Sequence, residues 1–346
     1  MSLRLLGLLG VPHALALGLC ARYGFPVDGP AWYAPRRVAG LLRAVLSELG
    51  LVRLARRWWG WRALYRTTPL RVGPLDYGTP GRALDVYRRP GSVGRPVVVF
   101  LYGGAWGSGT RTLYAPLAQA LVERGFAVVV PDYTLHPHGQ VQAMLLDLRR
   151  VLAWVAVHAP EHGGDPSRVA LLGHSAGAHL AALLTVRAAL EGDSALLSQI
   201  RCVAGLAGVY DIGDHYLHEQ GRGVESISPM RTVMGGSPEG FGAASPSALL
   251  EGRTSISGPP FLLVHGTGDA TVPFRSSERF SEALRRAGWP LELRSYPGVG
   301  HLQLLLGLQG PEPFRERLLG ELEDFLRGGE GPGPLPRRDL APPLAL

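Results

Sequence analysis

A serine between two glycines is the feature of this sequence best suited to chemistry. The stretch Val169–Leu180 rises through an apolar run to Gly173, places Ser175 and Gly177 at two-residue intervals, and continues into a helical pattern. This order predicts a buried strand, a very tight turn and a helix start, with the serine at the tip of the turn. The two glycines remove side chains that would clash across such a turn. The pattern is typical of a nucleophilic serine, which still requires a base, an orienting acid and oxyanion donors.

A base and an acid for this serine follow later in the chain. Asp269 lies just after the predicted strand Phe261–His265, and His301 lies in a glycine-rich loop after the predicted strand Leu291–Ser295. A serine hydroxyl needs a histidine to take its proton, and the histidine needs a carboxylate to orient it. The order serine, acid, histidine, each at the carboxyl end of a strand, is that of one group of catalytic triads. We therefore predict Ser175, Asp269 and His301 as catalytic residues.

Two other acids compete for the orienting role. Asp211 and Asp214 follow the predicted strand Val203–Leu206, where some triads place their acid, but they are less well positioned than Asp269. Four further histidines are interpreted as ordinary polar residues: His136, His138, His215 and His218.

Consecutive glycines after another apolar strand satisfy the third requirement. The run Val97–Leu101 predicts a central strand, and the loop that follows it is Tyr-Gly-Gly-Ala-Trp-Gly-Ser-Gly. Backbone N–H groups in such a loop approach a developing oxyanion closely, where each is worth about 3 kcal/mol. We predict Gly103 and Gly104 as donors, with Ala176 supplying the N–H after the nucleophile. A flexible turn or a phosphate-binding loop is the alternative, but the lysine of a P-loop is missing.

Strand and helix patterns alternate around these residues, which predicts an α/β fold with a mainly parallel sheet and helices on both faces. The segment Tyr210–Ser257 lacks clean periodicity and is interpreted as an irregular insertion after the sixth strand. Besides the strands already named, the sequence predicts strands at Ala83–Tyr87 and Phe126–Val130. A turn at Gly163–Pro166 is predicted to precede the strand that leads to Ser175. Helices are predicted at Leu113–Arg124, Val141–His158, Ser276–Ala287 and Pro313–Leu326.

The two ends of the chain differ from this middle part. Residues 1–69 combine an apolar segment, Leu3–Cys20, with an amphipathic helix pattern, Val38–Leu54, followed by four arginines interleaved with three tryptophans. This composition favours either association with a membrane surface or a cap helix over the catalytic domain. The catalytic domain is predicted at residues 70–327, and the tail 328–346 is rich in proline and glycine, which predicts disorder.

Composition excludes several classes of function. The chain of 346 residues has a net charge of +7, all of its basic residues are arginine, and it contains no asparagine. The basic balance suits an anionic surface, but no nucleic-acid motif accompanies it. The two cysteines, Cys20 and Cys202, form neither a disulfide framework nor a zinc pattern. We therefore predict no metal, no cofactor and no nucleic-acid partner, and the pattern makes no prediction of oligomeric state.

Several separated motifs lie within about residues 70–327. They are Gly103-Gly104-Ala105-Trp106, Gly163-Gly164-Asp165-Pro166, Gly173-His174-Ser175-Ala176-Gly177-Ala178-His179, Gly205–His215, and His265-Gly266-Thr267 with Asp269 and Val272-Pro273. Together they resemble the esterase group of α/β-hydrolases related to hormone-sensitive lipase, and within it the isoprenylcysteine α-carbonyl methylesterases. The resemblance implies hydrolysis of the carboxyl methyl ester of a prenylated cysteine, on a lipidated peptide or a small molecule. It also implies a membrane of the endoplasmic reticulum or Golgi, with the cytoplasm as the alternative location.

The sequence also departs from that pattern. Tyr102 stands where many relatives begin the oxyanion loop with histidine, so the anchoring of the loop is expected to differ. His174 precedes the nucleophile, as in kynurenine formamidase-like members, so an N-formyl amide substrate is an alternative. A general carboxylesterase or lipase is a further alternative. A non-catalytic protein with the same fold is the alternative of another class, although the triad is complete in this sequence.

Overall fold

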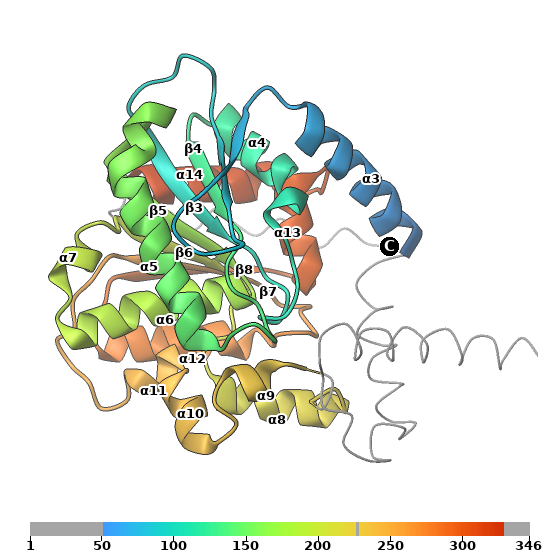
Figure 1. Cartoon of the computed structure of the whole chain (residues 1–346). Coiled ribbons are helices and arrows are strands. Elements are labelled where there is room, and N and C mark those ends of the chain that lie inside the picture. The colour runs from blue at the N-terminus through green and yellow to red at the C-terminus, as the bar shows by residue number, and fades with distance from the viewer. Residues whose placement is uncertain (1–50, 226–227, 329–346) are drawn as a thin grey trace, which may run out of the picture.

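The computed structural model describes residues 51–225 and 228–328, and short apolar runs in this part of the chain form one central sheet (Figure 1). Valine, leucine and phenylalanine suit strands that are covered on both faces. The strands are β1 (Arg71–Leu75), β2 (Leu84–Tyr87), β3 (Arg95–Leu101), β4 (Ala127–Pro131), β5 (Gly164–His174), β6 (Cys202–Leu206), β7 (Phe261–Gly266) and β8 (Leu291–Tyr296).

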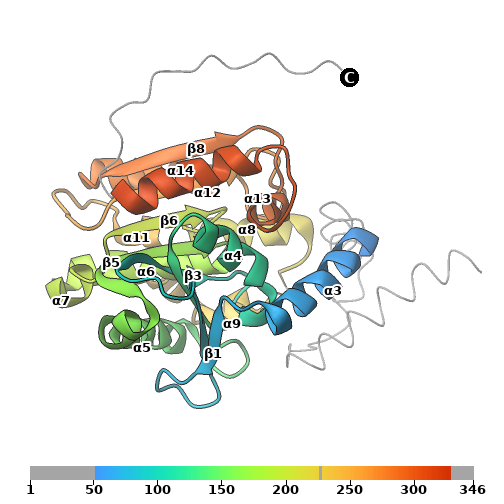
Figure 2. The same ribbon diagram turned by 90° about the horizontal axis from the view of Figure 1, so that it is seen from above.

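The sheet has eight strands in the order β1-β2-β4-β3-β5-β6-β7-β8. Strand β2 is antiparallel to both β1 and β4, whereas all pairs from β4 to β8 are parallel. Figure 2 shows the sheet from one edge strand to the other, with β1 at the bottom of the view and β8 at the top. Because parallel strands share a direction, the carboxyl ends of β3, β5, β6, β7 and β8 meet at one edge of the sheet, where the predicted site residues follow.

Helices cover both faces of the sheet, as predicted. The group α5, α6 and α12 packs on one face and the group α4, α13 and α14 on the other (Figure 1). The helices of the two faces are α4 (Ala115–Glu123), α5 (Val141–His158), α6 (Ala176–Glu191), α12 (Arg275–Arg286), α13 (His301–Gln309) and α14 (Arg315–Gly328). Short helical segments η2 (Arg111–Leu113), η3 (Ala159–His162) and α7 (Ser194–Leu197) connect them. Ion pairs from Arg124 at the end of α4 to Glu316 and Glu323 join α4 to α14.

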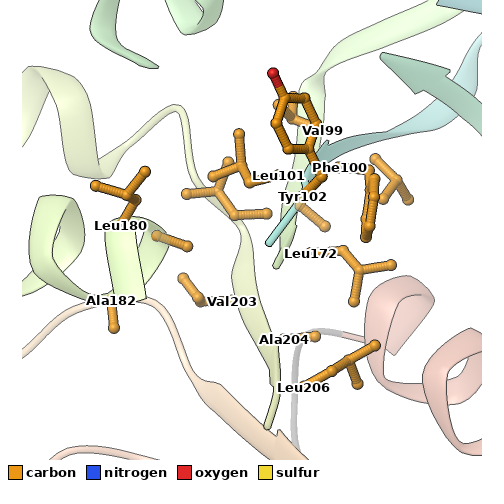
Figure 3. Packing of buried hydrophobic residues seen from close by; sticks show 14 of the residues in the cluster. Val99, Phe100, Leu101, Tyr102, Leu172, Leu180, Ala182, Val203, Ala204 and Leu206 are labelled. Atoms are coloured by element: carbon orange, nitrogen blue, oxygen red, sulfur yellow. The ribbon is translucent and has the colours of Figure 1, made fainter. Parts of the chain in front are cut away.

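The core lies on both faces of the sheet. Figure 3 shows buried side chains of β3, β5, β6 and α6, with Leu180 of α6 on one side of the strands and Phe100, Leu172 and Leu206 on the other. All four are fully buried. Burial of apolar surface contributes about 25 cal/mol per Å², so this packing holds the carboxyl ends of β3 and β5 in fixed positions relative to one another.

The insertion after β6 is helical rather than irregular. It contains α8 (Ile212–Arg222), α9 (Met230–Val233), α10 (Pro238–Ala243) and α11 (Pro246–Leu249), drawn in yellow and orange in Figure 1. Three of these helices have only four to six residues. Such lengths are too short for a 3.6-residue period to emerge from the sequence, which explains the missed prediction.

Three other elements differ from the prediction. Strand β1 was not predicted; it is a half-exposed edge strand with glycine and proline in its five residues, and such a composition argues against a strand. Strand β5 begins at Gly164, inside the predicted turn, because Gly163 adopts the left-handed conformation that ends η3 (φ 74°) and turns the chain into the sheet. Helix α13 was also not predicted, so His301 is the first residue of a helix rather than a loop residue.

Helix α3 (Leu51–Thr67) carries the four arginines and three tryptophans that are interleaved in the sequence, and it packs beside α4 and η2. Leu64 and Tyr65 contact the core, and the Arg71 guanidinium lies 4.3 Å from the centre of the Tyr65 ring. Trp59 is 69% exposed on the outer side. The predicted apolar segment 3–20, most of the predicted helix 38–54, Cys20 and the tail 329–346 lie outside the described residues, so the division into three regions stays a prediction.

Candidate active site

Ser175 occupies the turn between β5 and α6 with a strained backbone. Its φ and ψ are 54° and −118°, a backbone conformation that residues other than glycine rarely adopt. The turn is tight enough that a Cβ on Gly173 would lie 2.5 Å from the Ala178 nitrogen, and one on Gly177 would lie 2.0 Å from the Leu101 oxygen. Both glycines are therefore required by close backbone approach. The turn holds Ser175 at the carboxyl edge of the sheet, and the Ser175 N–H donates to the Leu206 carbonyl of β6 at 2.9 Å.

Asp269 and His301 meet at the same edge of the sheet. The His301 Nδ1 lies 2.7 Å from the Asp269 Oδ2, and both side chains are almost fully buried. The other carboxylate oxygen, Oδ1, accepts hydrogen bonds from the N–H groups of Thr271 and Val272 at 2.9 and 2.8 Å. The carboxylate is thus fixed on both sides, and its Oδ2 orients the imidazole with Nδ1 protonated.

His174 connects the serine turn to the histidine loop. It precedes Ser175 in the chain, its Nε2 lies 3.2 Å from the His301 carbonyl oxygen, and the two rings are 4.8 Å apart. Burial, followed by the nearby His301, lowers the pKa of His174 to about 3. The ring is therefore neutral, with Nε2–H as the donor to the carbonyl. The sequence indicated His174 only as a feature shared with formamidase-like relatives; the structure shows that it joins the residue before Ser175 to the backbone and ring of His301.

A second histidine, His265 at the end of β7, also contacts the predicted acid. Its Nε2 lies 3.2 Å from the Asp269 Oδ2 and 2.9 Å from the Val272 carbonyl, and its Nδ1 lies 2.7 Å from the Ser277 hydroxyl. Since both neighbours of Nε2 are acceptors, Nε2 carries the hydrogen. Burial alone raises the pKa of Asp269, but His301 and His265 outweigh it and hold that pKa well below its usual range. The sequence places His265 in one of the motifs but does not indicate this role.

The predicted oxyanion loop lies directly against the serine. A Cβ on Gly103 would come within 2.9 Å of the Ser175 Cβ, so the Gly103 backbone is in contact with the nucleophile position. Gly104 follows with φ 130°. Ala176 is the first residue of α6, where N–H groups have no intrahelical acceptor. The structure therefore brings the three predicted donor residues to the serine, and their role as an oxyanion hole stays a prediction.

The next two loop residues adopt the left-handed conformation without being glycine, with φ values of 50° at Ala105 and 58° at Trp106. Such strain costs of order 1–3 kcal/mol per residue and persists only where surrounding contacts impose it. Here the Trp106 Nε1–H donates to the His179 Nδ1 at 3.1 Å, and the His179 Nε2–H donates to the Ala244 carbonyl at 2.8 Å. This buried chain of contacts fixes the predicted oxyanion loop to the elbow helix α6 and to the insertion.

Tyr102 anchors the start of the loop through its phenol hydroxyl and its carbonyl group. Its hydroxyl donates to the Asp132 Oδ1 at 3.1 Å, and the Tyr133 hydroxyl donates to the Tyr102 carbonyl at 2.8 Å. Arg111 forms ion pairs with Asp132 and with the buried Asp85. The phenol and this ion-pair cluster therefore hold the backbone from which Gly103 and Gly104 project.

The two competing acids, Asp211 and Asp214, have other partners. The Asp211 side chain caps α8 by accepting from the Asp214 N–H at 2.9 Å. Asp214 forms ion pairs with Arg275 at 3.3 Å and with Arg279 at 2.8 Å. Neither acid has a described contact with His301, which already has Asp269 as its partner. Of the four histidines interpreted as ordinary, His136 and His138 lie in the loop after β4, and His215 and His218 lie on α8.

Comparison with known proteins gives the following likenesses. The BD-FAE family model matches residues 84–284. The chain is 36% identical over 274 residues to a probable isoprenylcysteine alpha-carbonyl methylesterase of Arabidopsis thaliana, covering 76% of this chain and 56% of the relative. It is 33% identical over 283 residues to the isoprenylcysteine alpha-carbonyl methylesterase of the same plant, covering 78% and 65%. Esterase LipQ of Mycobacterium tuberculosis is 35% identical, covering 65% and 55%.

Solved structures agree with the fold. Esterase 2 of Thermogutta terrifontis, phosphoramylated by tabun, is 26% identical with a TM-score of 0.57, covering 77% of this chain and 97% of that one. Esterase B of Lactobacillus rhamnosis has a TM-score of 0.66 at 19% identity, covering 84% and 95%, which bears on the fold alone. The alignments with the three curated relatives named above span 55% to 65% of those relatives' own length.

Proposed function

Because the chain belongs to the BD-FAE family of α/β-hydrolase esterases, we propose that it is a serine carboxylester hydrolase that works through an acyl-enzyme. The observation that carries the proposal is the 2.7 Å contact between Asp269 and His301, with the His301 ring packed on His174 beside the strained Ser175. A carboxylate, an imidazole and a serine hydroxyl in this order are the groups that nucleophilic ester hydrolysis needs.

Each group has a defined step in the proposed reaction. His301 Nε2 takes the hydroxyl proton as the Ser175 oxygen attacks the ester carbonyl, and Asp269 stabilises the resulting imidazolium. The N–H groups of Gly103, Gly104 and Ala176 hold the tetrahedral oxyanion. His301 then gives the proton to the departing alcohol, and the acyl group stays on Ser175. Water attacks the acyl-enzyme with His301 as base, which releases the acid and restores the serine.

For the substrate, we propose the methyl ester of a prenylated cysteine, either free or at the end of a lipidated peptide. Support comes from the similarity to proteins named isoprenylcysteine alpha-carbonyl methylesterase, at 33% and 36% identity. We expect N-acetyl-S-farnesylcysteine methyl ester to be hydrolysed with a kcat/KM at least about tenfold above the S-methyl analogue, because burial of each further CH₂ adds binding energy. The measurement is methanol release under initial-rate conditions.

Two further substrates make this comparison decisive. Cleavage of N-formylkynurenine alone would assign the chain to formamidase chemistry, and equal turnover of p-nitrophenyl butyrate and both cysteine esters would make it a general carboxylesterase. No turnover of any of these compounds by folded protein would favour a non-catalytic binding protein.

We also propose that α3 contacts an anionic membrane surface, at the endoplasmic reticulum or Golgi as the substrate class suggests. The described helices, between residues 51–225 and 228–328, include none that is long and apolar enough to cross a bilayer. A surface contact needs only exposed aromatic and basic side chains, and α3 carries Trp59, 69% exposed, together with the partly exposed Trp61 and the exposed Arg62.

The membrane proposal predicts that the full chain floats with vesicles of phosphatidylcholine and phosphatidylserine in a density gradient. Deletion of residues 1–62 is expected to abolish flotation, and Trp59→Glu to weaken it several-fold, because a charge replaces an interfacial ring. Val93→Glu is the matched control, since Val93 is 83% exposed in the loop before β3. If the full chain stays at the same place in the gradient with and without vesicles, the membrane proposal is wrong.

A further inference from the structure

One face of helix α8 rests on the loop that carries Asp269. His215, His218 and Arg222 are spaced at i, i+3 and i+7, so they share one face of the helix. The His218 Nε2–H donates to the Ala270 carbonyl at 3.1 Å, and Arg222 donates to the Thr271 carbonyl at 3.3 Å. Because Ala270 and Thr271 follow Asp269 directly, the face that includes His215 is turned toward the catalytic residues.

A different face of α8 lines an open and mainly apolar cavity of about 530 Å³ within the insertion. Gly213, Tyr216 and Leu217 supply this lining, with residues of α10 and α11 opposite them, and the catalytic triad does not contribute. The helix therefore separates this cavity from the triad. His215 belongs to the triad side.

The His215 side chain is buried without the contacts that a buried imidazole normally has. It is 8% exposed, and its Nδ1 has no hydrogen-bond partner among the described residues. Its Nε2 lies 3.6 Å from the Glu219 Oε1, which is longer than a hydrogen bond. Burial, then His218, His301 and Arg222, lower the pKa of His215 to about 3, while Asp269 acts in the opposite direction. The ring is therefore neutral and lies within electrostatic range of His301 and Asp269.

A buried polar atom without a partner is destabilising, and a leucine would fill the same space without that penalty. Packing alone thus gives no reason for a histidine at this position. Binding of substrate gives such a reason, because His215 lies on the triad side of α8 and an ester bound at Ser175 brings its own polar groups into the site. A methyl leaving group has no hydrogen-bond donor, so a donor must belong to the acyl part of the ester.

We propose that His215 determines specificity by accepting, at Nδ1, a hydrogen bond from an amide N–H that the ester carries beside its carbonyl. The inference rests on the proposed esterase function and narrows the substrate to esters of N-acylated amino acids. Glu219 sets the acceptor nitrogen by its charge rather than by a hydrogen bond: its carboxylate oxygen, 3.6 Å from Nε2, favours the tautomer with the hydrogen on Nε2, which leaves a lone pair on Nδ1. Burial raises the pKa of Glu219 to about 7, so the carboxylate is ionised at pH 8.

The test compares two esters at pH 8, N-acetylmethionine methyl ester and N-acetyl-N-methylmethionine methyl ester, in which a methyl group replaces the amide hydrogen. The wild-type chain is expected to prefer the first by about tenfold in kcat/KM, the value of one hydrogen bond to a buried neutral group. In His215→Leu the ratio is expected to fall to near one. Glu219→Gln keeps the shape of the site but lets an amide N–H face Nε2, which moves the ring hydrogen to Nδ1; the ratio is expected to fall there also.

His218→Gln is the matched control, because it lies on the same face of α8 but contacts a loop carbonyl; it should keep the wild-type ratio. The inference is wrong if the wild-type chain shows no preference, or if the preference survives in both His215→Leu and Glu219→Gln. Equal hydrolysis of both esters would overturn the inference and leave the esterase function standing. Absence of hydrolysis together with absence of fluorophosphonate labelling would instead remove the esterase function, and the inference with it.

Discussion

Ser175→Ala is expected to lower kcat roughly 10⁵- to 10⁶-fold, because the acyl-enzyme can no longer form and only binding and oxyanion stabilisation remain. Covalent labelling by a fluorophosphonate probe is expected to disappear completely, and peptide mapping of the labelled wild-type chain to place the adduct on Ser175. KM should change little, since the hydroxyl contributes mainly to the transition state. Labelling that persists in Ser175→Ala would place the nucleophile elsewhere, and folded wild-type protein that is not labelled at all would contradict the enzyme proposal.

Ser175→Gly is the informative companion, because the two variants share a loss of activity but differ in backbone strain. At φ 54° and ψ −118° an alanine keeps the Cβ and therefore the strain, so Ser175→Ala should melt close to the wild-type temperature. Glycine adopts this conformation freely, which relieves roughly 1–3 kcal/mol and outweighs its own entropic cost of up to about 1 kcal/mol. Ser175→Gly should therefore melt a few degrees higher. Equal melting temperatures would mean that the elbow stores no strain.

The sequence predicted the triad because each of its members follows a strand that is visible as an apolar run. Parallel strands buried on both faces leave such runs, and the chain order of Ser175, Asp269 and His301 then fixes which strand ends meet. The Gly103-Gly104 pair was predicted for the same reason, since it follows the apolar strand β3. Consecutive parallel strands from β3 onward were thus predictable, whereas the half-exposed edge strand β1 left no comparable run.

The contacts around the triad were not predictable, because they depend on distances across the fold. His174 reaches a carbonyl 127 residues away, and His265 reaches Asp269 by a turn whose shape depends on the packing of β7 against β8. Nothing in the spacing of these histidines distinguishes them from ordinary polar residues. His215 was interpreted as ordinary for the same reason. Its burial beside the Asp269 loop depends on α8, which has no clear pattern in the sequence because polar residues such as Asp214 and His218 interrupt it.

Asp269→Asn is expected to lower kcat about 10⁴-fold, and the hydrogen bonds around the carboxylate explain why the amide cannot adapt. Two backbone N–H groups, of Thr271 and Val272, bind Oδ1, so the amide oxygen must occupy that side. The NH₂ group then replaces Oδ2 and faces the Nδ1–H of His301 and the Nε2–H of His265, donor against donor. His301 relieves the conflict by moving its hydrogen to Nε2, and in that tautomer it cannot take the proton of Ser175.

The same variant should show a stability cost, with a sign that follows from the depressed pKa of Asp269. A carboxyl group whose pKa falls on folding stabilises the protein above its unfolded pKa, so Asp269→Asn should melt below wild type at pH 7 and approach it as the pH falls through the acid range. Activity is measured by ester hydrolysis and by the rate of fluorophosphonate labelling, which should slow by a similar factor. Asp214→Asn is the control, because Asp214 pairs with Arg275 and Arg279. A large loss in Asp214→Asn with a small one in Asp269→Asn would transfer the orienting role to the competing acid, since only the partner of His301 controls its tautomer.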